Sequence, residues 1–398
     1  MTGQSINLSG TAEVKFTGRA GKIVFAMTGA TGITGGIASS NLNVLHALNA
    51  LSLQSGRQLV VLSLHESEQD RPSFLDGDTI FIGFKGNRWA YASRFLMLFR
   101  HSRFYVFDHV RLGLPLAPMA FFGFRSFVIL AHGSESWKRV RGTSKWLFRR
   151  AAMCLTNSEY TLTKMQETFS GFAGRSCVLG LPPSHDTVVT ESSASAAKVV
   201  LPAVDGQTRA LGDQVILLVA RMDRDEREKG HYELLTVWPS VLRDCPGAQL
   251  VLAGPGNDRD GVTAMAERLQ VASTVFIPGY LSPELLRRVY SQCRAFVMPS
   301  RQEGFGLVYL EAMNFGKPCV GCRNGGSEDI IDDGASGLLI NNPFENEELL
   351  CVVQRLLGDE ELAARMGRAG LRRLSEGFTA THAQQRLRRL LAPMLECD

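Results

Sequence analysis

Short apolar runs alternate with longer amphipathic stretches along most of the chain. Six mostly apolar runs in the first half predict buried strands, and stretches such as 37–52 between them have the spacing of helices. Strands that alternate with helices predict an α/β fold with a parallel, doubly wound sheet. The six predicted strands are 22–27, 59–64, 79–82, 104–107, 127–131 and 153–156.

The alternation breaks between Leu181 and Gln214, where Pro182-Pro183, a Ser/Thr/Ala-rich stretch over 190–197 and Asp205-Gly206 indicate loops and a linker. A second alternating series then begins. Its predicted strands are 214–220, 248–253, 275–277, 295–299, 319–321 and 337–340, and its predicted helices include 231–242, 283–291, 346–357 and 360–375.

A chain of 398 residues is long enough for two domains that each bury a core. We predict a Rossmann-like N-terminal domain over 19–200 and a Rossmann-like C-terminal domain over 201–378. A basic amphipathic helix within 379–398 is expected to cross back to the N-terminal domain. Residues 1–18 lack the pattern of a signal peptide, and no uncharged apolar run reaches the length of a membrane span.

Charge is divided unevenly between the two halves. Residues 1–185 carry 20 Lys and Arg against 10 Asp and Glu, whereas the remainder carries 23 against 29. A basic first half indicates an anionic partner. Because no nucleic-acid-binding motif accompanies the charge, an anionic membrane surface or a lipid-phosphate acceptor fits better than nucleic acid.

Eight cysteines are scattered along the chain, and only Cys319 and Cys322 form a close pair. A zinc site would need a second pair at matching spacing, and the sequence has none. We interpret the cysteines as reduced, structural residues of a cytoplasmic protein.

Candidate chemistry follows the strand ends, where ligands bind in open α/β sheets. The segment from Thr28 to Gly36 after the first strand is rich in glycine, which lets a backbone approach a phosphate closely. Its glycines do not have the GxGxxG spacing, so a simple tight turn is an equal interpretation. His132 ends the fifth strand and is followed by Gly133, and it is either structural or functional.

The C-terminal half carries stronger signals. Arg221 and Lys229 follow its first strand, and such cations would neutralise a diphosphate. The strand that ends at Pro299 leads through Glu303-Gly-Phe-Gly306 into a helix containing Glu311. Backbone N–H groups at the start of this helix would bind a phosphate, and the two carboxylates would bind sugar hydroxyls. The residues that would supply these N–H groups are Phe305, Gly306, Leu307 and Val308.

These motifs together resemble a family 4 glycosyltransferase. The string EGFGLVYLEAM, in which seven residues separate Glu303 from Glu311, looks like the signature of that family, and Arg221 with Lys229-Gly230 precedes it in the usual order. The stretch between Arg221 and Lys229 is longer than the common form. Further matches are Gly35-Gly36, His132-Gly133, the Gly325-Gly-Ser-Glu328 loop, Asp333-Gly334 and Gly337.

The resemblance implies the GT-B fold, in which two Rossmann-like domains face each other across a cleft. It also implies site roles. Arg221 and Lys229 would hold the donor diphosphate, and Glu303 would position the donor sugar. Glu311 would bind the ribose, and His132 would contact the sugar near the reaction centre. The donor site would be completed by Gly35 and Gly36 beside the phosphates, Phe305, Gly306, Leu307 and Val308 as backbone contacts, and Tyr280 and Leu281 against the base.

The expected function is retaining transfer of a hexosyl group from a nucleotide-diphosphate sugar to a glycan or lipid-linked acceptor, in cell-surface polysaccharide or glycoconjugate biosynthesis. The protein is expected to be cytoplasmic, with peripheral binding at the cytoplasmic face of the membrane. No cofactor or metal is expected, because the DxD strings at Asp76, Asp223 and Asp258 fall in loops where aspartates are common. The resemblance suggests front-face attack, with the leaving phosphate taking the acceptor proton.

Two alternatives remain. A two-domain NAD-dependent oxidoreductase would need a GxGxxG after a strand, and glycines 29, 32, 35 and 36 do not give it. A non-catalytic nucleotide-sugar-binding protein would share the fold, but such proteins usually lose one of the charged residues that are intact here.

Overall fold

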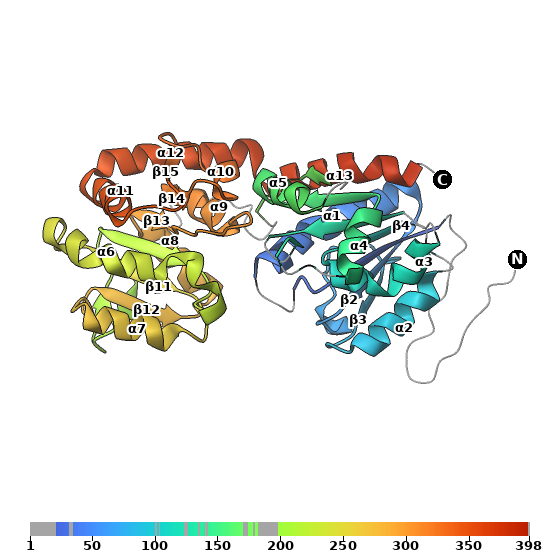
Figure 1. Cartoon of the computed structure of the whole chain (residues 1–398), viewed down its shortest axis with the longest axis horizontal. Helices are drawn as coiled ribbons and strands as arrows, with labels where there is room; N and C mark the ends of the chain where they lie inside the picture. The colour runs from blue at the N-terminus through green and yellow to red at the C-terminus, as the bar shows by residue number, and fades with distance from the viewer. Residues whose placement is uncertain are drawn as a thin grey trace, which may run out of the picture.

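The computed structural model shows two α/β domains side by side (Figure 1). It describes residues 21–31, 35–99, 102, 104–122, 126–133, 136–138, 140, 142–169, 174–177, 180–181 and 198–396. The predicted features at 1–18, Gly32, 182–183 and 190–197 therefore lie outside the described residues.

The N-terminal sheet has seven parallel strands in the order β3-β2-β1-β4-β5-β6-β7. All six strands predicted for this half are present within one residue at each end. The structure also contains β7, a strand at the sheet edge that the sequence does not predict. The strands are β1 Lys22–Met27, β2 Gln58–Ser63, β3 Ile80–Gly83, β4 Phe104–Phe107, β5 Phe127–Ala131, β6 Met153–Thr156 and β7 Gly174–Ser176.

Helices cover both faces of this sheet, as the prediction of a doubly wound sheet requires. The core on one face includes residues of α1, and the core on the other includes residues of α2, η2 and α4. The N-terminal helices are α1 Gly36–Ser55, α2 Arg88–Phe99, α3 Ala117–Phe121, α4 Gly142–Arg150 and α5 Glu159–Thr168, with 3-10 turns η1 Glu68–Asp70 and η2 Val110–Leu116.

The C-terminal sheet is parallel as well, with six strands in the order β12-β11-β10-β13-β14-β15. Its strands are β10 Val215–Val219, β11 Gln249–Ala253, β12 Val275–Gly279, β13 Ala295–Val297, β14 Cys319–Cys322 and β15 Gly337–Ile340. Its helices are α6 His231–Asp244, α7 Arg259–Arg268, α8 Pro283–Gln292, α9 Leu307–Asn314, α10 Ser327–Ile330, α11 Asn346–Gly358 and α12 Glu360–Gly377, with the 3-10 turn η6 Arg224–Lys229.

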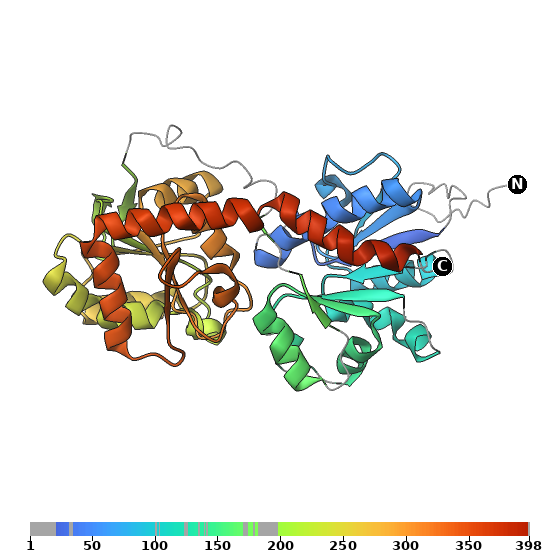
Figure 2. The same cartoon turned by 90° about the horizontal axis from the view of Figure 1, so that it is seen from above.

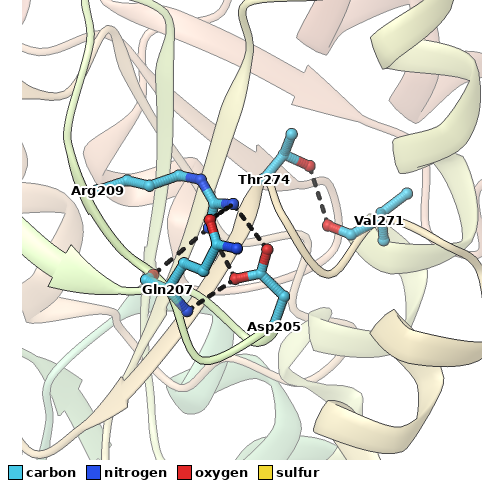
Figure 3. Close-up of polar contacts among 5 residues, drawn as sticks. All are labelled: Asp205, Gln207, Arg209, Val271 and Thr274. Carbon is cyan, nitrogen blue, oxygen red and sulfur yellow. Dashed lines mark hydrogen bonds and ion pairs between the residues drawn. The ribbon is translucent and has the colours of Figure 1, made fainter.

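One part of the predicted linker is structured, which corrects its interpretation as loop. β8 Val200–Pro202 and β9 Thr208–Ala210 form an antiparallel hairpin. Gly206 has φ +81° in the turn, and Arg209 binds Asp205 through two 2.7 Å bonds (Figure 3). The Val204 N–H donates to the Val275 carbonyl at 2.9 Å, so the hairpin belongs to the C-terminal domain.

Helix α13 (Ala380–Glu396) returns to the N-terminal domain. Figure 2 shows α12 over the C-terminal domain and α13 continuing across the N-terminal one. Leu387, Leu391 and Leu395 are buried in the same core as α1, and Arg57 donates to the Leu395 carbonyl at 2.6 Å. The helix therefore ties the end of the chain to the first domain.

Truncating Leu391 to alanine is expected to destabilise the N-terminal domain by about 2–5 kcal/mol, because it opens a cavity between α13 and the sheet. The measurement is unfolding in urea, monitored by intrinsic fluorescence. The exposed Leu53→Ala on α1 is the matched control and should change the unfolding free energy by less than ~0.5 kcal/mol. Equal effects of both substitutions would contradict the packing described for α13.

The two chain crossings between the domains touch each other. The Leu181 N–H donates to the Phe378 carbonyl at 2.8 Å. Asn43 of α1 donates to the carbonyls of Gly180 and Leu181, both at 3.1 Å. These bonds hold the two crossing segments together, and against α1, at the junction between the domains.

Cys319 and Cys322 are free thiols buried in β14. Burial raises the pKa of Cys322 to about 12, so this thiol is protonated near neutral pH.

Within the described part of the chain, no helix combines the length and the apolar character needed to cross a membrane.

Candidate active site

The site is built where both sheets change winding direction. In the first sheet this point lies between β1 and β4, and in the second between β10 and β13. Ligands of open α/β sheets bind beyond the strand ends at such points. The two points approach each other, because a Cβ placed on Gly36 of α1 would lie 3.9 Å from Leu307 of α9.

Two helix N-termini therefore meet at the domain interface. Gly35 precedes α1 with φ +123°, a conformation that favours glycine, and the first turn of α1 contains no acidic residue. Gly306 precedes α9 with φ +92°, and the first turn of α9 contains no acidic residue either. Both ends carry partial positive charge, so an anion between them would be stabilised from two sides.

Two buried carboxylates hold the loop before α1 in its conformation through hydrogen bonds. Asp108 accepts hydrogen bonds from the Thr28 N–H and from Asn41, both at 2.7 Å. Glu66 accepts from the Ala30 N–H at 2.8 Å and the Thr31 N–H at 2.6 Å. Sequence reasoning missed both acids because they lie at other strand ends, 36 and 80 residues from the groups that they bind.

Lys229 and Glu303 form the central ion pair of the C-terminal side. The Lys229 Nζ lies 3.0 Å from the Glu303 carboxylate, and the two side chains are only 19% and 13% exposed. Burial lowers the pKa of Lys229, but attraction to Glu303 and the hydrogen bond outweigh it, so the net shift is upward. The lysine is therefore a fixed cation near neutral pH.

Arg221 lies apart from this pair in the present arrangement. Its guanidinium is 63% exposed and pairs with Glu226 of η6, with Asp223 at 3.7 Å. Glu226 also attracts Lys229, so the acid is within electrostatic reach of both cations. The longer Arg221-to-Lys229 stretch thus supplies an acidic partner that holds Arg221 at the surface.

Glycines shape the loop that carries Glu303. A Cβ on Gly306 would lie 2.5 Å from the Tyr309 ring, and Phe305 beside it is buried. A Cβ on Gly304 would lie 2.6 Å from the His132 carbonyl and 2.7 Å from the Gly133 Cα. The loop therefore presses against the N-terminal domain through a position that admits no side chain.

Hydroxyl groups of the N-terminal domain hold the same loop. Ser158, the N-cap of α5, donates to the Gly304 carbonyl, and the Thr161 hydroxyl donates to it at 3.1 Å. We call Ser158, Thr161 and Gly304 the cross-domain clamp. Nothing local in the sequence around Ser158 reveals a partner 146 residues away.

A second contact joins the domains beside the clamp. The Glu159 N–H at the start of α5 donates to the Asp329 carboxylate of α10 at 2.7 Å. Burial raises the pKa of Asp329 to about 6, and the bond from Glu159 opposes this shift. The interface between the domains thus contains a carboxyl group whose pKa is raised to about 6.

His132 lies at the same interface. It is half-buried, and its backbone carbonyl accepts from the Asn157 side chain at 2.6 Å. Its position against Gly304 brings it close to the loop of Glu303, as the predicted roles of both residues require.

Glu311 lies about one turn into α9, half-buried, and accepts from the Tyr290 hydroxyl at 3.0 Å. Burial raises the pKa of Glu311 to about 7, and the bond from Tyr290 offsets part of that shift. Tyr280 is 60% exposed just beyond β12, next to the buried Leu281. Val308 is half-buried in the first turn of α9.

The first aspartate of each C-terminal DxD string has structural partners. Asp258 is buried and accepts from Arg227 at 2.7 Å and from Tyr232 at 2.9 Å. Asp223 accepts from the Asn257 N–H at 3.1 Å. Across the described residues, no three His, Cys, Asp or Glu side chains gather as metal ligands would.

Residues 205–373 match the family described as glycosyl transferases group 1. Glycogen synthase of Mycobacterium tuberculosis is 28% identical over 61% of this chain and 54% of its own length. A GDP-mannose-dependent alpha-(1-6)-phosphatidylinositol monomannoside mannosyltransferase of Mycolicibacterium smegmatis is 29% identical over 64% of this chain and 66% of its own length. The chain thus spans between about half and two thirds of these curated relatives.

The fold matches as well. The structure of Anabaena HepE in complex with UDP and glucose superposes with a TM-score of 0.70, 15% identity and coverage of 94% of this chain and 100% of that chain. The chain therefore has the GT-B fold, as the sequence predicts, and its residues 205–373 resemble glycosyltransferases of the family 4 type. These matches favour that class over the oxidoreductase alternative.

Proposed function

We propose that the chain moves a hexosyl group from a nucleotide-diphosphate sugar to a glycan or lipid-linked acceptor, with retention of configuration. The observation that carries the proposal is the buried Lys229–Glu303 pair beside the α9 N-terminus, which faces the N-terminus of α1. A diphosphate placed there would meet one fixed cation and two helix ends, and Glu303 would accept hydrogen bonds from sugar hydroxyls.

Charge development explains how this arrangement would accelerate transfer. Breaking the glycosidic bond leaves positive charge on the sugar and adds negative charge to the departing diphosphate. Lys229 and the α9 N–H groups would stabilise that negative charge without reorganising. Arg221 would join them once the diphosphate competes with Glu226 for its guanidinium.

Retention is proposed to proceed by front-face attack. Two buried carboxylates on the described N-terminal side, Asp108 and Glu66, are both engaged by backbone N–H groups of one loop, so we assign neither as a nucleophile. The leaving phosphate would then take the acceptor proton. We propose that no metal takes part, because Lys229 and the helix ends supply the positive charge.

The relatives support the choice of substrates. One solved neighbour was crystallised with UDP and glucose, and one relative is named as using GDP-mannose and a phosphatidylinositol monomannoside. We accordingly propose a nucleotide-hexose donor and a cytoplasmic reaction that serves polysaccharide or glycoconjugate biosynthesis at the membrane face. His132 would contact the sugar, and Tyr280 with Leu281 would lie against the base.

The proposal is tested by release of nucleoside diphosphate from UDP-, GDP- and ADP-hexoses, with and without EDTA. One donor should be turned over, at equal rates in both conditions, and the anomeric proton of the product should show the configuration of the donor. Inversion would overturn the mechanism, and loss of turnover in EDTA would overturn metal independence. Turnover of none of the donors would overturn the proposed reaction.

The elevated pKa of Glu311 predicts a pH dependence of nucleotide binding. Above its folded pKa of about 7 the group is a carboxylate that can accept both ribose hydroxyls, whereas below that pH it is protonated. Affinity for the nucleoside diphosphate should therefore rise up to about tenfold between pH ~6 and ~8. Calorimetric titration measures it. The Glu311→Gln variant should bind weakly without this rise, and an equal rise in the variant would contradict the role of Glu311.

The raised pKa of Glu311 also predicts how the free energy of unfolding varies with pH. Between the ordinary glutamate pKa and about 7, the folded state keeps a proton that the unfolded state has lost. The contribution of Glu311 to the unfolding free energy is thus fully present at low pH and is lost as the pH rises through about 7. Glu311→Gln should remove this slope from a series of melting curves.

A further inference from the structure

An open cavity lies at the far end of the C-terminal domain from the proposed donor site. Its volume of about 640 Å³ is within the range of small-molecule binding sites. Its walls come from segments that precede three adjacent strands, namely 211–213 before β10, 291–294 before β13 and 315–318 before β14. The donor site lies beyond the opposite, carboxyl ends of the same sheet, so the cavity is a separate feature.

Helix α12 forms the remaining wall of the cavity. Glu360, Ala363 and Arg368 of this helix line it. A Cβ on Gly367 would overlap the Gly316 carbonyl oxygen, so α12 lies directly against the turn after α9 with no room for a side chain between them. The wall is therefore built from closely packed secondary structure rather than from loops alone.

Three cations in the lining of this cavity have no counter-charge. They are Lys198, Lys317 and Arg368, and none of their charged groups has an ion pair or a hydrogen bond with any described residue. Burial raises the pKa of the Cys293 thiol in the cavity wall to about 11, and the charge of the half-buried Lys317 opposes that shift, so Lys317 lies close to this wall. A half-buried cation loses hydration, and an anion in the cavity would stabilise it.

Two carboxylates line the same cavity. Glu360 is paired with Arg294 at 3.3 Å, and Arg294 also donates to the Asp213 backbone carbonyl at 3.2 Å. The Asp213 side chain is exposed. These two acids would accept hydrogen bonds from hydroxyl groups but would repel an anion placed directly against them. The lining thus fits a molecule that carries both an anionic group and hydroxyl groups.

A sugar phosphate has both kinds of group. Its phosphate carries close to two negative charges near neutral pH and offers acceptor oxygens to lysine and arginine. Its hydroxyl groups would donate to Asp213 and Glu360. We propose that this cavity binds a sugar phosphate, at a site distinct from the donor site.

The side chain of Tyr290 connects the cavity to the donor site. Phe315 lines the cavity and stacks on Tyr290, with the ring centroids 5.6 Å apart. The Tyr290 hydroxyl donates to Glu311, the proposed ribose ligand, at 3.0 Å. A ligand that shifts Phe315 would therefore alter the position of Glu311 through packed side chains. This link rests on the proposed function, whereas binding in the cavity does not.

The test is calorimetric titration of the full chain with ribose 5-phosphate, inorganic phosphate and ribose. Ribose 5-phosphate should bind, and more weakly in high salt. Inorganic phosphate lacks the hydroxyl groups that the acids would bind, so its affinity should be at least about tenfold lower, and ribose should not bind. The double variant Lys317→Ser, Arg368→Ser should lower the affinity for ribose 5-phosphate at least about tenfold.

Matched variants separate the cavity from other phosphate-binding groups. Arg365→Ser and Arg268→Ser remove exposed cations of α12 and α7 that do not line the cavity, so both should bind ribose 5-phosphate as the unchanged chain does. Lys229→Ala removes the cation of the donor site and should also leave this binding unchanged. Melting curves should show that the double variant is folded.

Coupling between the two sites is measured with the nucleoside diphosphate that the chain binds. Saturating ribose 5-phosphate should change the Kd of the nucleotide by about fivefold or more, and the nucleotide should change the Kd of ribose 5-phosphate by the same factor. Tyr290→Phe keeps the ring that stacks on Phe315 but removes the hydroxyl that Glu311 binds. It should therefore reduce the coupling while binding in the cavity is retained.

The cavity site would be overturned by absence of ribose 5-phosphate binding, by equal binding in the double variant, or by loss of binding in Lys229→Ala. Equal affinities for ribose 5-phosphate and inorganic phosphate would overturn the sugar phosphate as ligand. A nucleotide Kd that ribose 5-phosphate leaves unchanged would overturn the link to the donor site. Failure of every nucleoside diphosphate to bind would count against the proposed function and not against the cavity site.

Discussion

Replacing Lys229 with alanine is expected to lower the rate of sugar transfer by about 10²–10³-fold, the largest effect that we predict. The substitution removes a largely buried cation beside the α9 N-terminus, where negative charge would develop on the leaving diphosphate. Kinetics with saturating acceptor and varied donor measure it. Both kcat and kcat/KM should fall, because the interaction would be strongest in the transition state.

Two comparisons make the Lys229 result specific. Arg224→Ala, in the same turn, removes an exposed cation paired with Asp258 at 3.6 Å and should leave the rate within about twofold. Removing Lys229 also strands Glu303 as a buried unpaired acid, so the melting temperature must be recorded beside the rate. A folded Lys229→Ala enzyme with an unchanged rate would refute the assignment of Lys229.

Replacing Gly304 with alanine should lower kcat by up to about 100-fold. The added methyl would lie 2.6 Å from the His132 carbonyl, so the cross-domain clamp must open or shift. A misplacement of about 1 Å between reacting groups can cost that much. Gly304 is not in the left-handed region, so alanine should be tolerated within the C-terminal domain itself. The measurement is kcat together with the Kd of the nucleoside diphosphate.

The expected signature is a loss of kcat with little change in Kd, because the clamp joins the domains and the nucleotide would bind the C-terminal domain. Gly77→Ala is the matched control, since its methyl would meet nothing within 4 Å and its rate should be unchanged. A Gly304→Ala enzyme with full kcat would show that the clamp is not part of the active arrangement. A large loss of nucleotide affinity would instead place the effect within the donor loop.

Much of the fold could be predicted because its strands are buried on both sides. Such strands appear as continuous apolar runs, and those of β1, β4 and β11 were predictable to within a residue. The β8–β9 hairpin was interpreted as linker because its strands have three residues each and are half exposed. β7 was missed for the same reason, since three residues with one arginine give no periodic signal.

The site could be predicted only where its residues are adjacent in sequence. Glu303, Gly306 and Glu311 share one strand-loop-helix unit, so their spacing carries the information. The clamp and the loop-folding acids join positions 36–146 residues apart, and no local pattern encodes such contacts. The pairing of Arg221 with Glu226 could not be predicted either, because the loop contains several acidic residues and the sequence does not show which of them pairs with the arginine.

The central claim is that a nucleoside diphosphate binds beside Lys229 and the α9 N-terminus. The most direct test is thermal unfolding of the unchanged chain and of Lys229→Ala with GDP, UDP, ADP or NAD, each with and without EDTA. At about 100 times its Kd, one nucleoside diphosphate should stabilise the unchanged chain by about 2.7 kcal/mol regardless of EDTA, and the variant much less. Stabilisation by NAD alone, or equal stabilisation of the variant, would contradict the account.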